Sequence, residues 1–230
     1  MRKEPLVTEE CYHIYNRGVD KRDIFNNLED LERFKESMKQ FNRTEGIGSL
    51  ELHRKLVRGL GSHIEKDIEP IVSIVAFCIN PNHFHFILKQ LVDDGISNFL
   101  QKLQGGYTYY FNKKHERSGS LFQGTFKSKL IDDEDYFRKI FGYTNQNYLV
   151  HEIPKNKFQF IFASDKEYES GVFDYVSPVE GGEMLRIFNG KFNLKKHCAE
   201  IISIIRNERG KASLEEEIDE LPSESLNLSP

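Results

Sequence analysis

The hydrophobic residues in the first half of the chain recur at two different spacings, which predict two kinds of element. Alternation of Tyr and Ile over residues 11–16 is typical of a strand, and the apolar, β-branched run at 71–79 predicts a buried central strand. The Asn-Pro-Asn turn at 80–82 leads into a further predicted strand at 83–89, so these two strands form a hairpin. Residues 121–131 alternate as one more strand.

Helical spacing separates these strands. Residues 29–41 predict an amphipathic helix, and Ser97 is the expected N-cap of a second helix that ends near His115. Acidic residues at 132–135 open a third helix, which ends near 147–150. The order β-α-β-β-α-β-α predicts an α+β fold of the ferredoxin-like split βαβ type, an antiparallel sheet with helices on one or both faces, plus an added C-terminal helix.

Less regular segments interrupt and follow this pattern. Residues 44–69 carry four glycines among charges and predict a polar insertion with room for a short helix. Residues 151–214 predict an extension with small helices near 184–187 and 194–205. The acidic residues from 215 to 230 predict a disordered tail.

Composition and the distribution of charge limit the classes of function that this sequence can have. The 230 residues have a net charge of −4, but this sum hides a basic stretch at 98–131 and an acidic end after 210, so a phosphate-binding face is possible. Three distant cysteines without a CxxC pair indicate reduced thiols. With no apolar stretch of membrane-spanning length and no signal peptide expected at the start, the sequence predicts a cytoplasmic protein without a membrane partner.

Two histidines begin the second strand of the predicted hairpin. His83 and His85 project from the same face of a strand, roughly 7 Å apart along the chain, while Phe84 and Phe86 point to the other face. Two imidazoles side by side form half of a site for a divalent metal. Two hydrogen-bonded histidines without a metal are the competing interpretation.

The last predicted helix carries the second candidate group. Tyr143 and Asn147 are four residues apart, so on a helix they share a face. If the helix packs on the sheet, the amide completes the metal ligands and the phenol lies beside them. The residue types alone leave further tyrosines open as nucleophile. These are Tyr136, Tyr107, Tyr109 and Tyr110.

Several stretches carry a family resemblance. They are Tyr12–Gly18 (YHIYNRG), Asn80–Phe86 (NPNHFHF), Tyr110–Gly124 (YFNKKHERSGSLFQG), Phe126–Ser128 and Tyr143–Asn147. In this order the chain resembles the single-tyrosine HUH transposases of the insertion sequence 200-like family, most closely their REP-associated tyrosine transposase branch. The resemblance covers about residues 8–150, which we take as the predicted transposase domain.

The resemblance implies a site and a reaction. His83 and His85 match the histidines that bind Mg²⁺ or Mn²⁺, Tyr143 matches the nucleophile, and Asn147 matches a third ligand. The chain departs from the family in lacking a proline after Asn147, so Gln146 stays an alternative ligand. The implied reaction cleaves and rejoins single-stranded DNA through a 5′-phosphotyrosine.

The resemblance also implies single-stranded DNA with a hairpin as the partner, bound by a monomer or a homodimer. Arg17, Lys113, Lys114, Arg117 and Lys127 are the candidate phosphate contacts. Two other functions stay open. A domesticated hairpin-binding protein would need none of the catalytic groups together, and a metal phosphohydrolase that uses water would need more ligands than two histidines and an amide.

Overall fold

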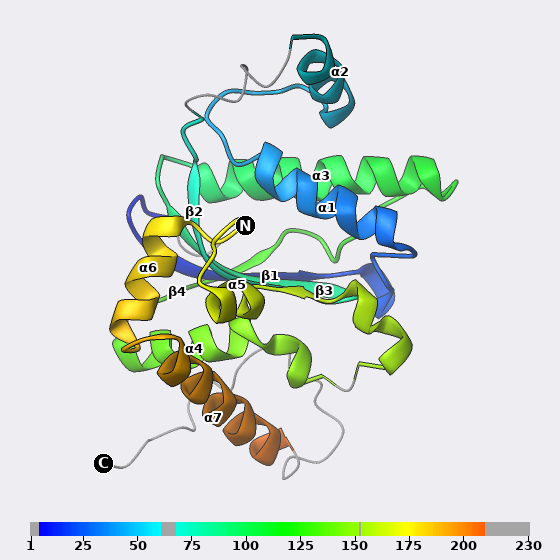
Figure 1. Ribbon diagram of the computed structural model, residues 1–230. Helices are drawn as coiled ribbons and strands as arrows, with labels where there is room; N and C mark the ends of the chain where they lie inside the picture. Colours follow the sequence, from blue (N-terminus) through cyan, green and yellow to red (C-terminus); the bar gives the residue numbers. More distant parts are fainter. Residues whose placement is uncertain (1–4, 61–67, 152, 210–230) are drawn as a thin grey trace.

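The computed structural model describes residues 5–60, 68–151 and 153–209. Its centre is a five-stranded antiparallel sheet in the order β4-β1-β3-β2-β5 (Figure 1). The strands are β1 (Cys11–Arg17), β2 (Val72–Ile79), β3 (His83–Gln90), β4 (Lys127–Leu130) and β5 (Phe162–Ala163). The first four strands have the ferredoxin-like order, so the predicted fold class is confirmed.

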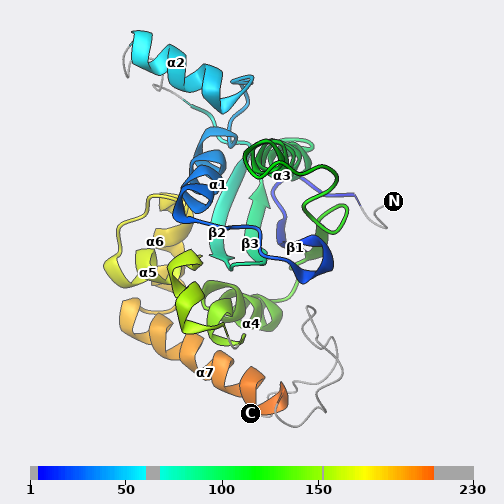
Figure 2. The same cartoon turned by 90° about the vertical axis from the view of Figure 1, so that its right-hand side faces the viewer.

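Helices cover both faces of the sheet. On one face lie α1 (Leu28–Gln40) and α3 (Gly95–Lys114), and on the other lies α4 (Glu134–Asn145), itself covered by α7 (Lys191–Arg209) (Figures 1 and 2). The helix of the insertion, α2 (Leu50–Leu60), stands apart from the sheet beyond α1 (Figure 2). The remaining helices are α5 (Asp165–Ser170), α6 (Pro178–Ile187) and the 3₁₀ helices η1 (Val19–Lys21), η3 (Asn147–Leu149) and η4 (Lys155–Phe160).

The face under α1 and α3 forms an aromatic core. Phe84 of β3 lies 6.0 Å from Phe34 of α1, centroid to centroid, and Phe34 meets Tyr107 of α3 edge-on at 5.1 Å. Phe86 contacts Phe99 of α3 at 6.3 Å. All five rings are completely buried, so the alternation of β3 delivers its phenylalanines to this core and its histidines to the opposite face.

Two predicted boundaries are wrong. The strand expected at 121–131 is regular only over Lys127–Leu130, because Gly124 adopts a positive φ of 66° and the chain before it folds back over the end of β1. There Gln123 N–H donates to the Arg17 carbonyl. The N-cap of α3 is Asp94 in the left-handed conformation, so Ser97 lies inside the helix.

The C-terminal extension contains more structure than its sequence predicted. The 3₁₀ helix η4, β5 and α5 had no prediction, and α6 and α7 are longer than the small helices expected there. The extension bonds to the backbone of β2: Ser164 Oγ accepts from Phe77 N–H at 3.0 Å, and Ser177 Oγ accepts from Ile74 N–H at 2.8 Å. The division at residue 150 stays a prediction, and the tail at 215–230 lies outside the described residues.

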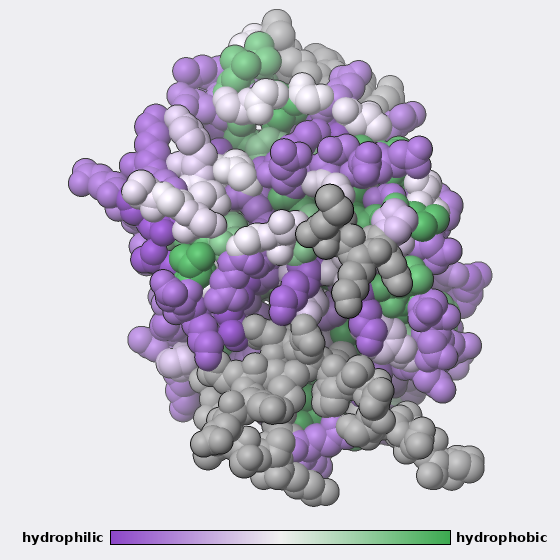
Figure 3. Space-filling model, turned by 180° about the vertical axis from the view of Figure 1, so that it is seen from behind, coloured by the Kyte–Doolittle hydropathy of each residue, from purple (hydrophilic) through white to green (hydrophobic). Residues whose placement is uncertain are grey.

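The described surface has no single large apolar face in the view from behind. There, hydrophobic residues form small separate areas among hydrophilic ones (Figure 3). Within the described ranges, no helix is both long enough and apolar enough to cross a membrane.

Candidate active site

The two predicted histidines lie side by side on the face of the sheet that α4 covers. Pairing of β1 with β3 sets Tyr15 opposite His85 and Arg17 opposite His83. The His83 and His85 ring centroids are 5.3 Å apart, and their side chains are 4% and 1% exposed. The strand alternation therefore produces the predicted pair, in a site closed to solvent.

Hydrogen bonds define which nitrogen of the His83 ring carries the proton. Its Nδ1 lies 2.6 Å from the Asn82 carbonyl oxygen Oδ1, which only accepts, so Nδ1 carries the proton and donates. The other ring nitrogen, Nε2, then has a lone pair and accepts from the Asn80 amide Nδ2 at 2.9 Å. This orients the Nε2 lone pair into the site, as a metal-binding histidine requires.

The amide after the tyrosine reaches the same nitrogen. Asn147 Oδ1 lies 3.0 Å from His83 Nε2 and accepts from Asn80 Nδ2 at 2.7 Å. Asn147 does not belong to the helix that carries Tyr143, in contrast to the spacing-based prediction, because α4 ends at Asn145 and Asn147 begins η3. The turn between them brings its side chain under the sheet, where it is completely buried.

Gln146, the second candidate for the amide ligand, points elsewhere. It lines a pocket of about 390 Å³ between the end of α4 and α7, together with Lys195 and Arg206. Asn145 also turns toward the extension, where its Oδ1 accepts from Ser164 Oγ at 2.6 Å. Of the three consecutive amides, Asn147 is the one that faces His83.

The candidate nucleophile lies against the histidines. The Tyr143 ring is 1% exposed and meets His85 edge-on, with the centroids 5.3 Å apart. Tyr136, which is also on α4, lies under the ammonium group of Lys129 at 4.3 Å from the ring centroid. Three more tyrosines that the sequence left open belong to α3, on the opposite face of the sheet. They are Tyr107, Tyr109 and Tyr110.

Sequence reasoning missed a third histidine of this face. His13 of β1 stacks on His85 with the centroids 5.2 Å apart, and its Nε2 lies 3.0 Å from His85 Nδ1. Burial lowers the pKa of His13 to about 3, with a further contribution from the positive charge of Lys129, so the ring is neutral. The neutral tautomer of His13 with its proton on Nδ1 accepts the proton of His85 Nδ1, and in that arrangement the lone pair of His85 is on Nε2.

A fourth imidazole lies at the other end of the pair. The His151 ring centroid is 4.5 Å from that of His83, just after η3. Neither His13 nor His151 has a motif spacing to the His-x-His pair, because they reach it from other elements. The only available signal was the position of His13 within the YHIYN stretch.

The candidate phosphate contacts separate into two groups. Lys127, on β4, lies 5.5 Å from the ring of Tyr15, which stacks on His85, and Arg17 lies opposite His83, so both belong to the histidine face. The remaining three lie at the end of α3. Lys113 is exposed, Lys114 is bound to Glu29 and Asp30, and Arg117 donates to Asn112 Oδ1 and the Ser120 carbonyl.

The donor atoms fit a small divalent cation. Two imidazoles and an amide oxygen are suitable ligands for Mg²⁺ or Mn²⁺, and the His83 Nε2 and Asn147 Oδ1 atoms lie 3.0 Å apart. Among the described residues, no three His, Cys, Asp or Glu side chains gather in a metal-binding group. Any metal here would therefore depend on the amide.

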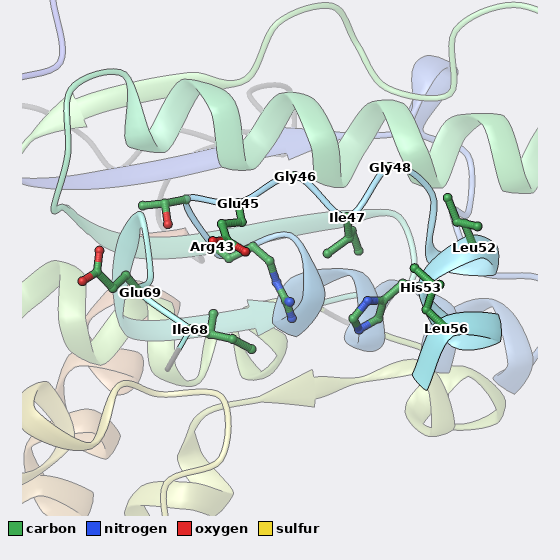
Figure 4. A pocket seen from close by; sticks show the side chains of 11 residues that line it. Arg43, Glu45, Gly46, Ile47, Gly48, Leu52, His53, Leu56, Ile68 and Glu69 are labelled. Carbon is green, nitrogen blue, oxygen red and sulfur yellow. The ribbon is translucent and has the colours of Figure 1, made fainter. Parts of the chain in front are cut away.

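A separate pocket is lined by residues that belong neither to the histidine face nor to the candidate phosphate contacts. It has a volume of about 770 Å³ and is lined by Arg43 and by residues of the insertion, including His53 and Ile68 (Figure 4). No predicted site residue lines it.

One comparison with known proteins agrees with the family resemblance over part of the chain. Residues 53–147 match the family model described as transposase IS200 like, and this segment contains His83, His85, Tyr143 and Asn147. No curated protein matches the chain. A solved structure described as the REP associates tyrosine transposase bound to a REP hairpin is similar at 13% identity and a TM-score of 0.49, over 76% of this chain and 88% of that one.

Proposed function

With the resemblance to IS200-like transposases confirmed over residues 53–147, we propose that this chain cleaves and rejoins single-stranded, hairpin-bearing DNA through a covalent tyrosine intermediate. The single observation that carries the proposal is that one closed face of the sheet holds His83 beside Asn147 and His85 beside Tyr143. A pure DNA-binding protein has no need to bury these groups together.

We assign the metal site to His83, His85 and Asn147. A bound Mg²⁺ or Mn²⁺ would supply Lewis-acid stabilisation of the charge that develops on the scissile phosphate. Asn82 holds His83 in the required tautomer, and neutral His13 does the same for His85. The protein thus fixes both lone pairs before the ion arrives.

Tyr143 is the proposed nucleophile. Its phenol oxygen attacks the phosphorus, the bond from phosphorus to the 3′ oxygen breaks, and the products are a 5′-phosphotyrosine and a free 3′-hydroxyl. A second 3′-hydroxyl reverses the step and rejoins the strand, releasing the tyrosine. Because Tyr143 is 1% exposed, its phenol must become accessible before DNA can reach it.

Arg17 and Lys127 are the proposed phosphate contacts nearest the reacting centre, since both lie on strands of the histidine face. Lys113, Lys114 and Arg117 would contact more distant parts of the DNA. Of these, Lys114 is engaged with Glu29 and Asp30, so its contribution is expected to be the smallest.

Incubation with single-stranded hairpin oligonucleotides and Mn²⁺ tests the proposal, with covalent protein–DNA adducts measured by mass. Tyr143→Phe should lose adduct formation while its hairpin affinity stays within a few-fold, because only the phenol oxygen is removed. Tyr136→Phe is the matched control and should retain the adduct. Adducts undiminished in the Tyr143 variant would move the nucleophile elsewhere.

The same assay separates the remaining candidate functions. A domesticated hairpin-binding protein would bind the oligonucleotides without an adduct in any metal. A phosphohydrolase that uses water would cut the strand without a protein–DNA band on a denaturing gel.

A further inference from the structure

Asn80 lies beside His83 and Asn147 in the candidate metal site, although no motif assigned it a role. It follows β2 in the turn before His83 and is completely buried. Its Nδ2 lies 2.9 Å from His83 Nε2 and 2.7 Å from Asn147 Oδ1, and these two atoms are 3.0 Å apart. The three atoms therefore form a nearly equilateral triangle.

The hydrogen bonds of the triangle are consistent with one another. His83 Nε2 carries a lone pair because Nδ1 donates to Asn82, and Asn147 Oδ1 also accepts. The two hydrogens of the Asn80 amide satisfy both acceptors at once. In this state the amide nitrogen supplies the partial positive charge toward which both lone pairs point.

The triangle has the dimensions of a metal coordination face. Mg²⁺ binds its ligands at about 2.0–2.1 Å in octahedral geometry, so neighbouring ligands lie about 2.8–3.0 Å apart. The observed edges of 2.7, 2.9 and 3.0 Å approach these values. One ion above the triangle would lie within reach of all three corners once the side chains turned their lone pairs toward it.

We propose that Asn80 is a further metal ligand of this chain. A half-turn of its amide group places Oδ1 where Nδ2 now lies, which converts the third corner from a donor into an oxygen ligand. On the other side of the amide, the Cys78 thiol contacts Asn80 Oδ1 at 3.7 Å. A thiol both donates and accepts weakly, so it serves the amide in either orientation.

This inference rests on the proposed metal centre and completes it with a ligand set of two imidazoles and two amide oxygens. It also accounts for a site without carboxylates. A second amide oxygen supplies a hard ligand from the hairpin turn, next to the strand that carries both histidines.

The sign of the effect of Asn80→Leu on Mn²⁺ binding separates a ligand from a competitor. If Asn80 is a ligand, its removal should raise the Kd for Mn²⁺, measured by titration calorimetry, at least about tenfold. Water-proton relaxation of bound Mn²⁺ should report an additional exchangeable water in the variant. If the amide only competes with the ion, the Kd should fall, and a lower or unchanged Kd overturns the proposal.

Two further variants keep the test decisive. Asn145→Leu removes another buried amide of the same region, which bonds to Ser164, and should leave the Kd unchanged. Asn80→Asp should bind Mn²⁺ more tightly than the natural chain, because a carboxylate then replaces an amide. A higher Kd for Mn²⁺ in a folded Asn80→Asp protein would contradict a ligand role. This variant also serves if Asn80→Leu does not fold, as judged by circular dichroism.

His83→Ala distinguishes this inference from the proposed function. Loss of Mn²⁺ binding in His83→Ala together with an unchanged Kd in Asn80→Leu overturns the role of Asn80 alone. Absence of Mn²⁺ binding by the natural chain overturns the metal centre and the role of Asn80 together.

Discussion

The two faces of β3 are made by alternate residues of one strand, yet they have opposite characters. On one side, Phe84 and Phe86 join an aromatic core under α1 and α3. On the other, His83 and His85 meet polar partners from β1, the hairpin turn and η3. Both faces are buried to a similar degree, so burial does not distinguish the aromatic face from the one proposed to be functional. The difference lies in what each buried group requires from its neighbours.

The largest expected effect on stability belongs to the aromatic face. Phe84→Ala should lower the free energy of unfolding by about 3–5 kcal/mol, because it removes a completely buried ring and leaves a cavity. Urea denaturation measures this loss. His85→Ala is the matched change on the opposite face, and we expect it to lower stability less while removing Mn²⁺ binding. Equal destabilisation by both variants would mean that the histidine face also serves mainly as core.

The second-largest expected effect on stability belongs to the charged cluster around Asp30, at the edge of the aromatic face. The Asp30 side chain is completely buried and accepts from Lys114 at 2.9 Å, His115 at 3.0 Å and Asn26 N–H at 2.9 Å. Asp30→Asn removes the charge that these donors share, and should lower stability at pH 7 by about 1.5–3 kcal/mol, measured by urea denaturation.

The pH dependence of the Asp30 variant sharpens this prediction. Burial raises the pKa of Asp30, but hydrogen bonds from Lys114, Asn26 N–H and His115 outweigh it, and the net pKa is lowered. A lowered pKa in the folded state stabilises the protein above the unfolded pKa of about 3.9, and this contribution is lost as the pH falls through the folded pKa. The stability difference between the two proteins should therefore shrink at acidic pH. A difference that is constant with pH would contradict an ionised Asp30.

The smallest expected effect belongs to His13, which is proposed to orient His85 rather than to bind the metal. His13→Phe should preserve the fold, because the new ring has a similar volume, but it removes the acceptor for His85 Nδ1. The affinity for Mn²⁺ should fall about 10- to 100-fold, as for other residues that orient metal ligands. His53→Phe changes a buried histidine outside the site and should leave the affinity unchanged. An unchanged Mn²⁺ affinity in His13→Phe would show that His85 needs no orienting partner.

The aromatic face could be predicted from the sequence because the periodicity that produces it lies within single strands and helices. Periodicity identified all four main strands and the helices that cover them, and it placed Phe84 and Phe86 opposite the histidines. The errors occurred where the backbone departs from regular geometry. Gly124 shortens β4, and Asp94 in the left-handed conformation moves the start of α3 away from Ser97.

The histidine face was predicted only in part because its contacts come from separate elements. The spacing of His83 and His85 is a property of one strand, and so it was visible. The choice between Asn147 and Gln146 depends on the turn after α4, which no periodicity describes. His13 and Asn80 reach the pair through the register of β1 and the geometry of a turn, and a single sequence gives neither.

The two edge strands of the sheet limit how copies of this chain can associate. In the described part of the chain, β4 forms one edge with four residues, of which Lys127 and Lys129 are exposed, and β5 forms the other with two residues. Short edge strands and edge lysines disfavour the addition of a strand from another molecule. The long apolar strand β2 lies inside the sheet only because β5 covers its end. Removal of the extension would expose β2 as a template for aggregation, so the C-terminal segment protects the sheet that carries the histidines from pairing with other copies.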